Sequence, residues 1–408
     1  MSDFLAQHPL LVVSIIKIAV LMFLLLTVIA YLTWFERKVV AHIQSRWGPY
    51  RTGPHGLLQP LADGLKFLFK EDVTPMGANR FVYYLAPFLS LSLALTAIAL
   101  IPFGPGEFTL FGHRTQLAVA DLNVGLLFLF AITSLGVYGV ALAGWSSNSK
   151  YPLLGGLRSS AQMVSYELSL TMSVVGVLLM AGTFNLREII AAQSGFLWGF
   201  LPRWNIVAPP LPQLLGFFCF FTAAVAETNR LPFDLPEAES ELVAGFHTEY
   251  ASFKFAMFFM GEYASMITVS CLATILFLGG WLSPIPNVAL LSWTRYLPAI
   301  FLGGGGVWLI LHGIRYRTPL GRVALPLLGL VLSGGAYLVS QSPVVDFVQG
   351  PFWFFSKVFV FLFLYVWIRG TLPRFRYDQL MAVGWKLLLP ASLLNVVLTS
   401  LAIAVAKR

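Results

Sequence analysis

The acidic side chains of this sequence concentrate in one polar segment, where they could take up protons. Six acids follow one another closely there: Glu227, Asp234, Glu237, Glu239, Glu241 and Glu249. On a helix, Glu237 and Glu241 would lie on the same face, where repulsion between like charges favours protonation of one of them. A helix that starts after Pro236 would explain one or two of these acids through its dipole, but not all six. The segment is therefore suited to proton uptake.

Two more acids, Glu167 and Glu262, lie inside apolar runs that are long enough to cross a bilayer. Each is about eight residues from the predicted cytoplasmic end of its run, or roughly 12 Å along a helix. An ionisable group at that depth is costly to bury and is a candidate for function, although a structural pair with another helix would also explain it. Since Glu227 ends a third run on the same side, the three acids predict a chain of titratable sites in the cytoplasmic half of the membrane.

The segment from residue 36 to residue 80 is the second place where charged residues gather. It begins with Glu36 and Arg37 and continues through a Gly- and Pro-rich stretch that starts at Arg46. Further on, leucines spaced for one helical face alternate with Asp63 and two lysines, which predicts an amphipathic helix along the membrane surface. A passive interfacial anchor is the simplest interpretation of that helix, but the irregular backbone fixed by the Gly- and Pro-rich stretch favours a functional one.

The elements that must position these residues are membrane-spanning helices. Of the 408 residues, 58% are hydrophobic and 11% are charged, whereas soluble domains carry about a quarter charged residues. This composition excludes an ordinary cytosolic enzyme, a secreted scaffold and a disordered chain. Runs of about 20 apolar residues predict an all-α, polytopic helical membrane protein with about ten transmembrane helices. The predicted spans are residues 10–34, 81–103, 122–144, 160–182, 211–226, 255–282, 297–313, 323–340, 351–369 and 386–406.

Basic residues orient this bundle. The loops after the odd-numbered spans contain 18 of the 26 Lys and Arg residues, when Lys17 and Lys357 are counted as snorkelling residues of the opposite side. Since cytoplasmic loops are enriched in Lys and Arg, the amino terminus is predicted to be periplasmic. The same enrichment explains the net charge of +8 without nucleic acid. The sequence has no internal repeat, and we interpret residues 1–408 as a single helical membrane domain.

Metal and nucleotide chemistry find no support in the sequence. Cys219 and Cys271 lie far apart in apolar runs, and the six histidines lack ligand spacing. The four glycines at 303–306 follow no strand and do not form a phosphate loop, so they predict close helix packing. We therefore expect no metal site in this chain, and any NADH would be oxidised by another subunit.

In these same segments the sequence resembles the H subunit of bacterial NADH-quinone oxidoreductase. That family is equivalent to mitochondrial NADH dehydrogenase subunit 1 and supplies a membrane subunit of respiratory complex I. The resemblance covers nearly the whole chain in order, and several long motifs in register are far more specific than one short pattern. The motifs are Glu36-Arg37-Lys38 and the segments 46–54, 56–72, 147–167, 227–250 and 374–389, the last with Arg376-Tyr377-Asp378-Gln379-Leu380-Met381.

This resemblance implies that the chain forms much of a quinone-access chamber at the junction with the peripheral arm. Quinone would be the substrate, no cofactor would be bound covalently, and FMN and iron-sulfur clusters would be held only by partner subunits. The chamber positions then fall on Glu36, Arg37, Arg46, Asp63, Arg230 and Asp234. The proton-coupling path falls on Glu167, Glu227, Glu237, Glu239, Glu241 and Glu262.

The resemblance also implies partners and a layout for the chain. The loop at 36–80 with its surface helix and the acidic loop at 227–254 would contact the peripheral subunits that hold the quinone site and the terminal iron-sulfur cluster. Antiporter-like membrane subunits would adjoin the acidic path, in the bacterial inner (plasma) membrane. The family has eight spans, so two further apolar runs between residues 284 and 350 are interpreted as an inserted helical hairpin, peripheral to the chamber. That hairpin could instead contact a neighbouring subunit or a lipid.

Two other classes of function stay open at this point. A standalone ion transporter would predict inverted repeats and broken helices near the membrane midplane, and neither is detected. An anchor subunit of a related membrane-bound hydrogenase or other dehydrogenase is the closer alternative. The motif from Glu227 to Glu241 and the loop that begins at Arg374 favour the quinone enzyme over it.

Overall fold

The computed structural model describes residues 9–110, 113–234, 244–286, 289–316 and 319–406. Among these residues, nine helices are long and apolar enough to cross a membrane. A further apolar helix, α8 (Leu214–Glu227), is shorter and has 14 residues. Each of these ten helices overlaps one predicted span, so the predicted all-α membrane fold is confirmed.

The long helices follow one another in chain order and are joined by shorter elements. The long ones are α2 (Pro9–Ile43), α4 (Arg80–Ile98), α5 (Gly125–Ser146), α6 (Lys150–Ala181), α10 (Ser252–Phe277), α11 (Leu297–Ile314), α12 (Pro319–Ser340), α13 (Ser342–Thr371) and α15 (Leu389–Ala406). The short ones are η1 (Pro54–Gly56), α3 (Gln59–Phe69), α7 (Leu186–Ala192), η2 (Gly245–His247), η3 (Ala289–Tyr296), α14 (Tyr377–Ala382) and the π-helical η4 (Val383–Leu388), which joins α14 to α15. Two small antiparallel hairpins pair β1 (Glu107–Leu110) with β2 (His113–Gln116) and β3 (Phe196–Leu197) with β4 (Leu201–Pro202).

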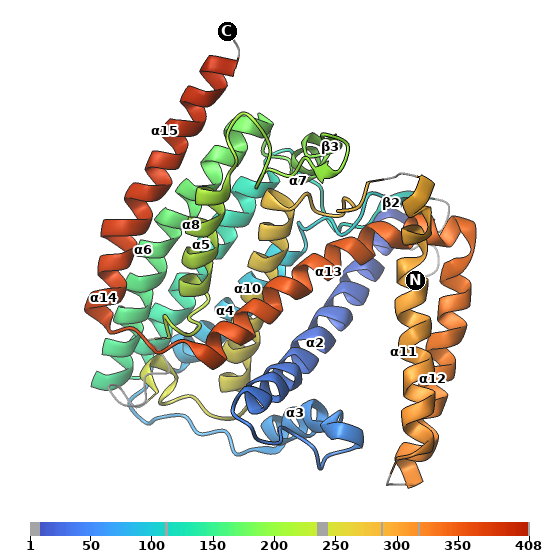
Figure 1. Ribbon diagram of the computed structural model, residues 1–408. Coiled ribbons are helices and arrows are strands. Elements are labelled where there is room, and N and C mark those ends of the chain that lie inside the picture. Colours follow the sequence, from blue (N-terminus) through green and yellow to red (C-terminus); the bar gives the residue numbers. More distant parts are fainter. Residues whose placement is uncertain (1–8, 111–112, 235–243, 287–288, 317–318, 407–408) are drawn as a thin grey trace.

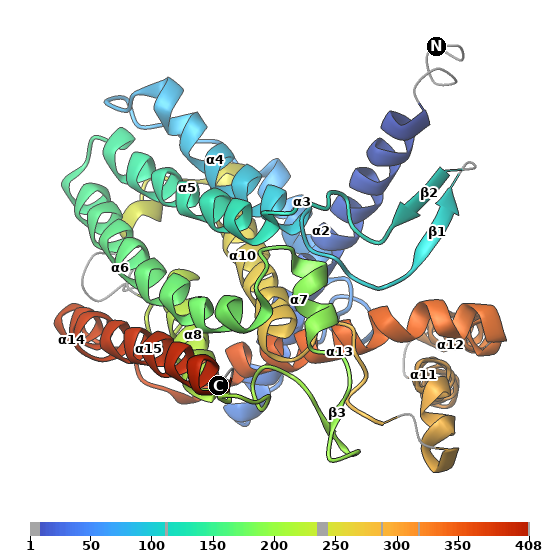
Figure 2. The same ribbon diagram turned by 90° about the horizontal axis from the view of Figure 1, so that it is seen from above.

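Helix α10 lies near the middle of the bundle (Figures 1 and 2). Its sequence is apolar or small on almost every side, and 78% of its most apolar window is buried, against 17% for the corresponding window of α2. A helix that is apolar all round can be covered on every face by other helices. Helices α2, α4, α8 and α13 pack against it. The few polar side chains of α10 therefore face other helices of the same chain.

Glycines allow some of these helices to approach closely. A Cβ atom on Gly144 of α5 would lie 2.5 Å from the main-chain oxygen of Pro152 in α6, so no larger residue fits there. In the glycine run at 303–306, Gly306 of α11 has the same role, because its Cβ would lie 2.7 Å from the main-chain oxygen of Gly329 in α12. The predicted packing role of this run is confirmed at Gly306.

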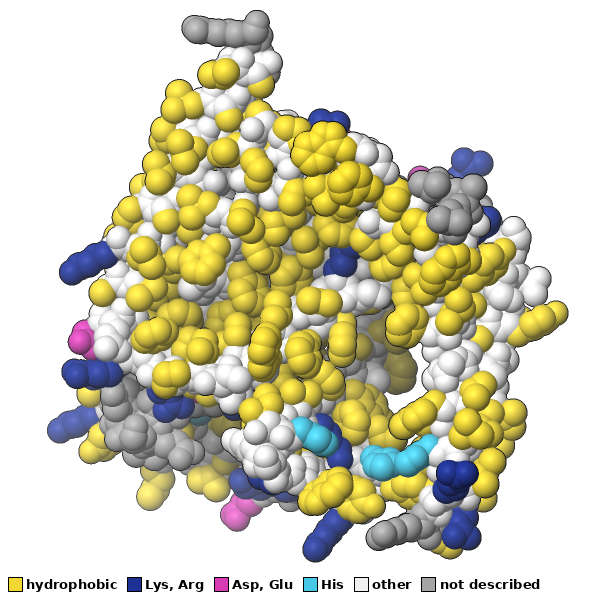
Figure 3. Space-filling model, viewed as in Figure 1, with side chains coloured by type: hydrophobic (Ala, Val, Ile, Leu, Met, Phe, Trp, Pro, Cys, Tyr) yellow, Lys and Arg dark blue, Asp and Glu magenta, His cyan; other side chains and the backbone are white. Residues whose placement is uncertain are grey.

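The loops that follow odd-numbered spans lie at one end of the bundle, which we call the inner end. There, the main-chain N–H of Phe375 donates to the oxygen of Pro232 at 3.0 Å, and that of Asn79 donates to the oxygen of Ser146 at 3.2 Å. Figure 3 shows a broad apolar surface with most of the Lys and Arg side chains gathered along its lower margin. The predicted sorting of the loops therefore agrees with the fold. We call the opposite end of the bundle the outer end.

Helices α11 and α12 pack against each other at one side of the bundle (Figure 1). At the outer end this pair meets the start of α13, where the rings of Phe301 and Phe352 are 5.8 Å apart. At the inner end, Nε2 of His312 lies 2.8 Å from Nε2 of His55, and the Tyr316 hydroxyl accepts the main-chain N–H of His55 at 3.0 Å. The two helices lie where a hairpin is predicted, and its insertion into the family fold stays a prediction.

Helix α6 begins at Lys150, whereas the predicted span begins at residue 160. Ser149 is extended ahead of the first turn, and Pro152 lies in that turn, where a proline is tolerated. Glu167 therefore lies 17 residues after Lys150, so the helix extends about ten residues beyond the predicted start of the span. Hydropathy detects only the apolar part of the helix, and the polar first turns extend it beyond that part.

Candidate functional site

Glu36, near the inner end of α2, is 5% exposed and accepts hydrogen bonds from three other segments. The Tyr263 hydroxyl of α10 donates at 2.8 Å, Nη1 of Arg230 in the turn after α8 lies 3.5 Å away, and Arg369 of α13 also donates. The Arg230 guanidinium lies 4.1 Å from the centre of the Tyr263 ring. We call these four residues the Glu36 cluster. It joins four parts of the chain around one buried carboxylate.

A second buried ion pair adjoins the Glu36 cluster. Asp234 is 3% exposed and lies 3.2 Å from Arg374, which acts electrostatically on Arg369. The two groups together contain two carboxylates and three guanidiniums, so their formal charge is +1. Buried ions are tolerated only when they are paired and hydrogen-bonded. This part of the inner end therefore joins several ionic groups, each of which has a partner of opposite charge.

A cavity of about 50 Å³ lies among α4, α5, α6, α10 and the end of α8, and we call it the inner cavity. Glu227 and Glu262 line it, together with Ser90, Thr133 and Ser265. A polar cavity of this size has room for a small number of water molecules, because each needs only about 10–15 Å³ of probe-occupied volume. Carboxylates beside such a cavity can exchange protons through water.

Glu227 has unused hydrogen-bonding capacity at the inner cavity. Its Oε2 atom is buried and has no hydrogen-bond partner among the described residues. Glu167 of α6 accepts a hydrogen bond from Ser134 of α5 and acts electrostatically on Glu227. Two like charges repel each other strongly in a buried site, so ionising both carboxylates together is costly. Together with Glu262, they form a set of acids that can share protons.

The turn after α8 connects the inner cavity to the Glu36 cluster. Glu227 ends α8, and Arg230 follows three residues later. Gln162 of α6 holds this turn, because its Nε2 atom donates to the main-chain oxygens of Ala226 and Phe233, both at 2.7 Å. Gln162 itself is fully buried. Only a short, firmly held segment therefore separates the two sites.

The structure brings together two sets of the predicted site residues. Glu36, Arg230 and Asp234 lie in the two adjoining ion-pair groups. Glu227 and Glu262 line the inner cavity, and Glu167 interacts with Glu227. These contacts bring the acids together as expected, while their roles stay predictions.

The other predicted site residues lie elsewhere. Arg37 and Asp63 form an ion pair of 2.6 Å at the surface, where the Arg37 side chain is 49% exposed. Arg46 is exposed, and its Nε atom donates to the Gln44 side chain at 2.8 Å. The structure does not bring these three residues into the Glu36 cluster. Glu237, Glu239 and Glu241 lie outside the described residues.

Sequence reasoning misses three members of these groups: Tyr263, Arg369 and Arg374. In the sequence, Arg369 and Arg374 are counted only among the basic residues of the inner loops. A basic residue at the inner end of one span and an acid at the inner end of another were an available signal for an ion pair. Tyr263 adjoins Glu262, but no pattern in the sequence distinguishes it from other aromatic residues of the bundle. The pairing of these groups depends on helix rotation, which hydropathy does not determine.

Hydrogen bonds and an ion pair hold the surface helix α3 against the start of α10. The Ser252 hydroxyl donates to two main-chain oxygens at the end of α3, both at 2.9 Å. Lys254, which is 5% exposed, lies 2.8 Å from Asp72 just beyond that helix. The apolar side of α3 is left uncovered by the chain, with Leu61 and Leu68 61% and 63% exposed. This arrangement agrees with the predicted amphipathic helix, whose leucines are available to the membrane or to a partner.

Metal chemistry has no candidate site in the part of the chain that the structure describes. No group of three or more His, Cys, Asp and Glu side chains there could hold a metal ion. Cys219 and Cys271 are buried free thiols in α8 and α10. The chemistry that the inner end offers is proton exchange and hydrogen bonding to oxygen atoms.

Comparisons with known proteins agree over nearly the whole chain. Residues 16–400 match the family model described as NADH dehydrogenase. NADH-quinone oxidoreductase H subunit 1 of Solibacter usitatus (strain Ellin6076) is 50% identical over 396 residues, which cover 96% of this chain and 97% of the relative. NADH-quinone oxidoreductase H subunit 2 of Koribacter versatilis (strain Ellin345) is 50% identical over 404 residues, covering 97% and 98%. The H subunit 1 of the same organism is 46% identical over 387 residues, covering 90% and 86%.

Proposed function

Because the chain belongs to the family of NADH-quinone oxidoreductase H subunits, which are membrane subunits of respiratory complex I, we propose that it forms the quinone-access chamber and couples quinone reduction to proton translocation. As a multi-pass subunit of this oxidoreductase, it works with other complex I subunits and quinone is the substrate. We place the chamber at the junction with the peripheral arm. FMN and iron-sulfur clusters belong to partner subunits, which supply the electrons. This identity replaces the transporter and hydrogenase alternatives.

One observation carries the proposal: a buried cluster of charged side chains is joined by one short turn to carboxylates that line a cavity. Glu36, Arg230 and Arg369 supply the charged groups, and Glu227 ends the helix that leads into the turn. Neither group needs such an arrangement for stability alone, since buried charges are costly even when paired. A link between charge and protons is the function that this arrangement supports best.

Quinone reduction takes two electrons and two protons, and negative charge develops on the quinone oxygens. Pre-oriented donors and fixed positive charge stabilise such oxygens. The guanidinium groups of Arg230, Arg369 and Arg374 are donors and positive charges of this kind. In this proposal Glu36, Arg230 and Asp234 line the chamber, and Arg37, Arg46 and Asp63 brace its inner edge. The partner subunits hold most of the quinone head group.

Protons then move along the acidic path. A change of charge in the Glu36 cluster reaches Glu227 through the turn after α8 and changes its affinity for a proton. Glu262 exchanges protons with Glu227 across the inner cavity, and Glu167, which acts electrostatically on Glu227 from α6, is the third acid of the path. Glu237, Glu239 and Glu241 extend this path, and antiporter-like membrane subunits receive the signal at its far end.

The inner end also offers a surface for the peripheral subunits. Trp47 and Phe69 in the first loop are 82% and 86% exposed, and exposed aromatic groups of this kind are typical of protein interfaces. We assign this surface to the subunits that hold the quinone site and the terminal iron-sulfur cluster. The basic inner loops then face the cytoplasm of a bacterial cell, with the amino terminus in the periplasm and the chain in the inner membrane.

Replacing Glu227 by Gln tests this proposal. The variant removes the titratable group at the inner cavity and keeps the size of the side chain. NADH-to-quinone electron transfer by the purified complex should fall at least about tenfold, because positioned proton-transfer groups typically contribute a hundredfold or more. Electron transfer from NADH to an artificial acceptor should stay unchanged, since it needs only the partner subunits. Both rates are measured on the same preparation, normalised to assembled complex.

The matched control is Glu107→Gln, which removes an exposed acid of β1 at the outer end. It should leave both rates unchanged. If Glu227→Gln leaves quinone reduction and the number of protons translocated per NADH unchanged in an assembled complex, the coupling role is wrong. Equal loss of both rates per assembled complex would show that the substitution disturbs electron transfer within the partner subunits, which also contradicts the proposal.

A further inference from the structure

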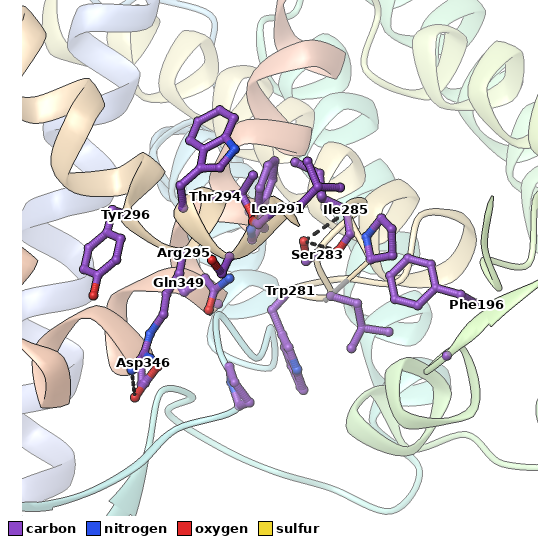
Figure 4. A pocket seen from close by; sticks show the side chains of 18 of the residues that line it. Phe196, Trp281, Ser283, Ile285, Leu291, Thr294, Arg295, Tyr296, Asp346 and Gln349 are labelled. Carbon is purple, nitrogen blue, oxygen red and sulfur yellow. Dashed lines mark hydrogen bonds and ion pairs between the residues drawn. The ribbon is translucent and has the colours of Figure 1, made fainter. Parts of the chain in front are cut away.

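A second and much larger pocket lies at the outer end, away from the quinone-coupling residues. Its volume is about 780 Å³, within the usual range of about 300–1,000 Å³ for ligand sites (Figure 4). The lining comes from segments that follow α4, α6 and α10, from η3 and from the first turns of α13. The pocket therefore lies at the joint between the α11–α12 pair and the rest of the bundle.

The lining is amphipathic. Four tryptophans contribute to it, namely Trp204, Trp281, Trp293 and Trp353. On one side, Nη2 of Arg295 lies 2.5 Å from Oδ2 of Asp346, and Figure 4 shows this pair at the wall of the pocket. Both side chains are partly exposed, at 38% and 61%, so both can reach a ligand. The pocket thus combines a cation, an anion and several indole rings.

The joint also contains hydrogen-bond donors that the described residues do not satisfy. Nε of Arg295 and Nε1 of Trp353 are buried and have no hydrogen-bond partner there. Buried donors in native proteins are normally satisfied by protein, water or ligand. Two such donors at one pocket indicate that an additional group with acceptor oxygens completes the joint.

We propose that this pocket binds the head group of a zwitterionic aminophospholipid from the outer leaflet of the membrane. Its phosphate contacts Arg295, and its ammonium group lies near Asp346 and the indole rings. The position fits this ligand, because the outer ends of membrane-spanning helices lie at the head-group level, where tryptophan is enriched. The exposed rings of Phe301 in α11 and Phe355 in α13 provide an apolar surface beside the pocket for the acyl chains.

The charge of the pocket selects among phosphate-bearing ligands. Arg295 and Asp346 together are neutral, so a zwitterion can pair with both, whereas an anionic lipid or free phosphate would be repelled by Asp346. Indole rings also favour a cation over their faces. Lys357 lies over Trp204 at 4.2 Å and Arg187 over Trp281 at 5.9 Å from the ring centres, so the rings of Trp293 and Trp353 are the ones we assign to the ammonium group. A bound lipid would stabilise the contact between the α11–α12 pair and the rest of the bundle. This site is independent of the proposed coupling path at the inner end.

The test uses whole complex purified in mild detergent and then washed to remove loosely held lipid. Bound phospholipids are extracted and counted by mass spectrometry for the parent, Arg295→Gln and Asp346→Asn complexes. Both variants should retain about tenfold less phosphatidylethanolamine at this site, since a hydrogen bond to a charged group is worth about a factor of ten or more. The control Arg114→Gln, which changes an exposed arginine of β2 at the same end, should retain as much as the parent.

A second measurement covers variants that fail to assemble. Phosphatidylethanolamine, phosphatidylglycerol or inorganic phosphate is added to the washed parent complex, and its thermal midpoint is measured. Stabilisation by phosphatidylethanolamine alone supports the proposal. An equal effect of phosphatidylglycerol would show a general apolar site, an effect of inorganic phosphate would show a simple anion site, and no effect of any addition would show no site. Each of these three results overturns the proposal, and none of them bears on the coupling role of Glu227.

Discussion

One buried ionisable group at each end of the bundle, Lys357 at the outer end and Glu227 at the inner end, can be compared. They differ in whether all of their donors or acceptors have hydrogen-bond partners. At the outer end, Lys357 of α13 is 8% exposed and donates to the main-chain oxygens of Leu278 at 2.7 Å, Gly280 at 2.9 Å and Leu282 at 2.6 Å. An ammonium group has three donors, and here all are used. The acceptors follow the end of α10, where carbonyl groups lack intrahelical partners. Lys357 therefore lies on the predicted outer side, but its ammonium closes a helix end and does not snorkel to the membrane surface.

At the inner end, one buried acid is left with an unused acceptor beside a cavity. Oε2 of Glu227 has no hydrogen-bond partner among the described residues, and the cavity that Glu227 shares with Glu262 can hold water. Burial of a charge therefore does not by itself indicate function. Lys357, whose donors are all used, closes a helix end, whereas unused hydrogen-bonding capacity next to space for water, as at Glu227, is typical of a group that changes its protonation.

The largest effect should come from the outer end. Lys357→Met keeps the length of the side chain but removes the ammonium, so three buried oxygens lose their donor. Each unsatisfied buried group costs about 1–3 kcal/mol, which predicts a loss of roughly 3 kcal/mol or more. Less complex should assemble and its thermal midpoint should fall, while quinone turnover per assembled complex stays near the parent value.

Lys386→Met is the control for this change, because Lys386 is exposed in η4 at the inner end. It should change neither assembly nor the thermal midpoint. The comparison between the two ends breaks down if the Lys357→Met complex assembles normally but loses quinone turnover. Lys357 would then be a functional charge despite its satisfied donors.

The stability of the protein should also depend on pH, through a third buried group. His247 of η2 lies among aromatic rings, with the ring centres of Phe246, Phe255 and Phe258 at 3.9 Å, 5.4 Å and 5.5 Å. Burial lowers the pKa of His247 to about 3. Because its unfolded pKa is about 6.5, the unfolded state binds a proton first, and stability that is complete above pH 6.5 is lost as the pH falls below it. At pH 5.5 this loss is about 1.4 kcal/mol.

His247→Phe should remove this sensitivity to acid. The thermal midpoint of the parent complex should fall more between pH 7.5 and pH 5.5 than that of the variant, when both are compared with their own values at pH 7.5. The aromatic surroundings accept a Phe side chain, so the variant should assemble. If parent and variant lose stability in parallel over this range, His247 is charged in the folded protein and the buried neutral state is wrong.

The sequence predicts the membrane fold well and the site only partly, for a physical reason. Apolar runs determine where spans lie, and each of the ten runs overlaps a helix. Helix ends are less certain, as the early start of α6 at Lys150 shows, because polar turns can extend a helix beyond the bilayer. The presence of Glu167, Glu227 and Glu262 in one region follows from their depth in the membrane.

What hydropathy does not contain is the rotation of each helix about its axis. Glu36 and Arg369 lie at the inner ends of two spans that are far apart in sequence, and only the packing of α2 against α13 brings them into contact. The same holds for Tyr263, which packing directs to Glu36 rather than to lipid. Arg46, by contrast, belongs to a motif that is evident in the sequence, yet in this chain it lies at the surface.

The smallest effect should come from the surface ion pair of the first loop. Arg37 and Asp63 are 2.6 Å apart, but their side chains are 49% and 22% exposed, so solvent screens the pair. Arg37→Gln should therefore cost only about 0.2–1 kcal/mol and leave the thermal midpoint almost unchanged. If the pair braces α3 against α2, Arg37→Gln and Asp63→Asn should both raise the KM for quinone, and by the same small factor. The double variant should then be no worse than either single variant, because all three lack the same contact. Additive effects of the two substitutions on that KM would show instead that each residue contacts a different group, and that the pair does not act as one brace.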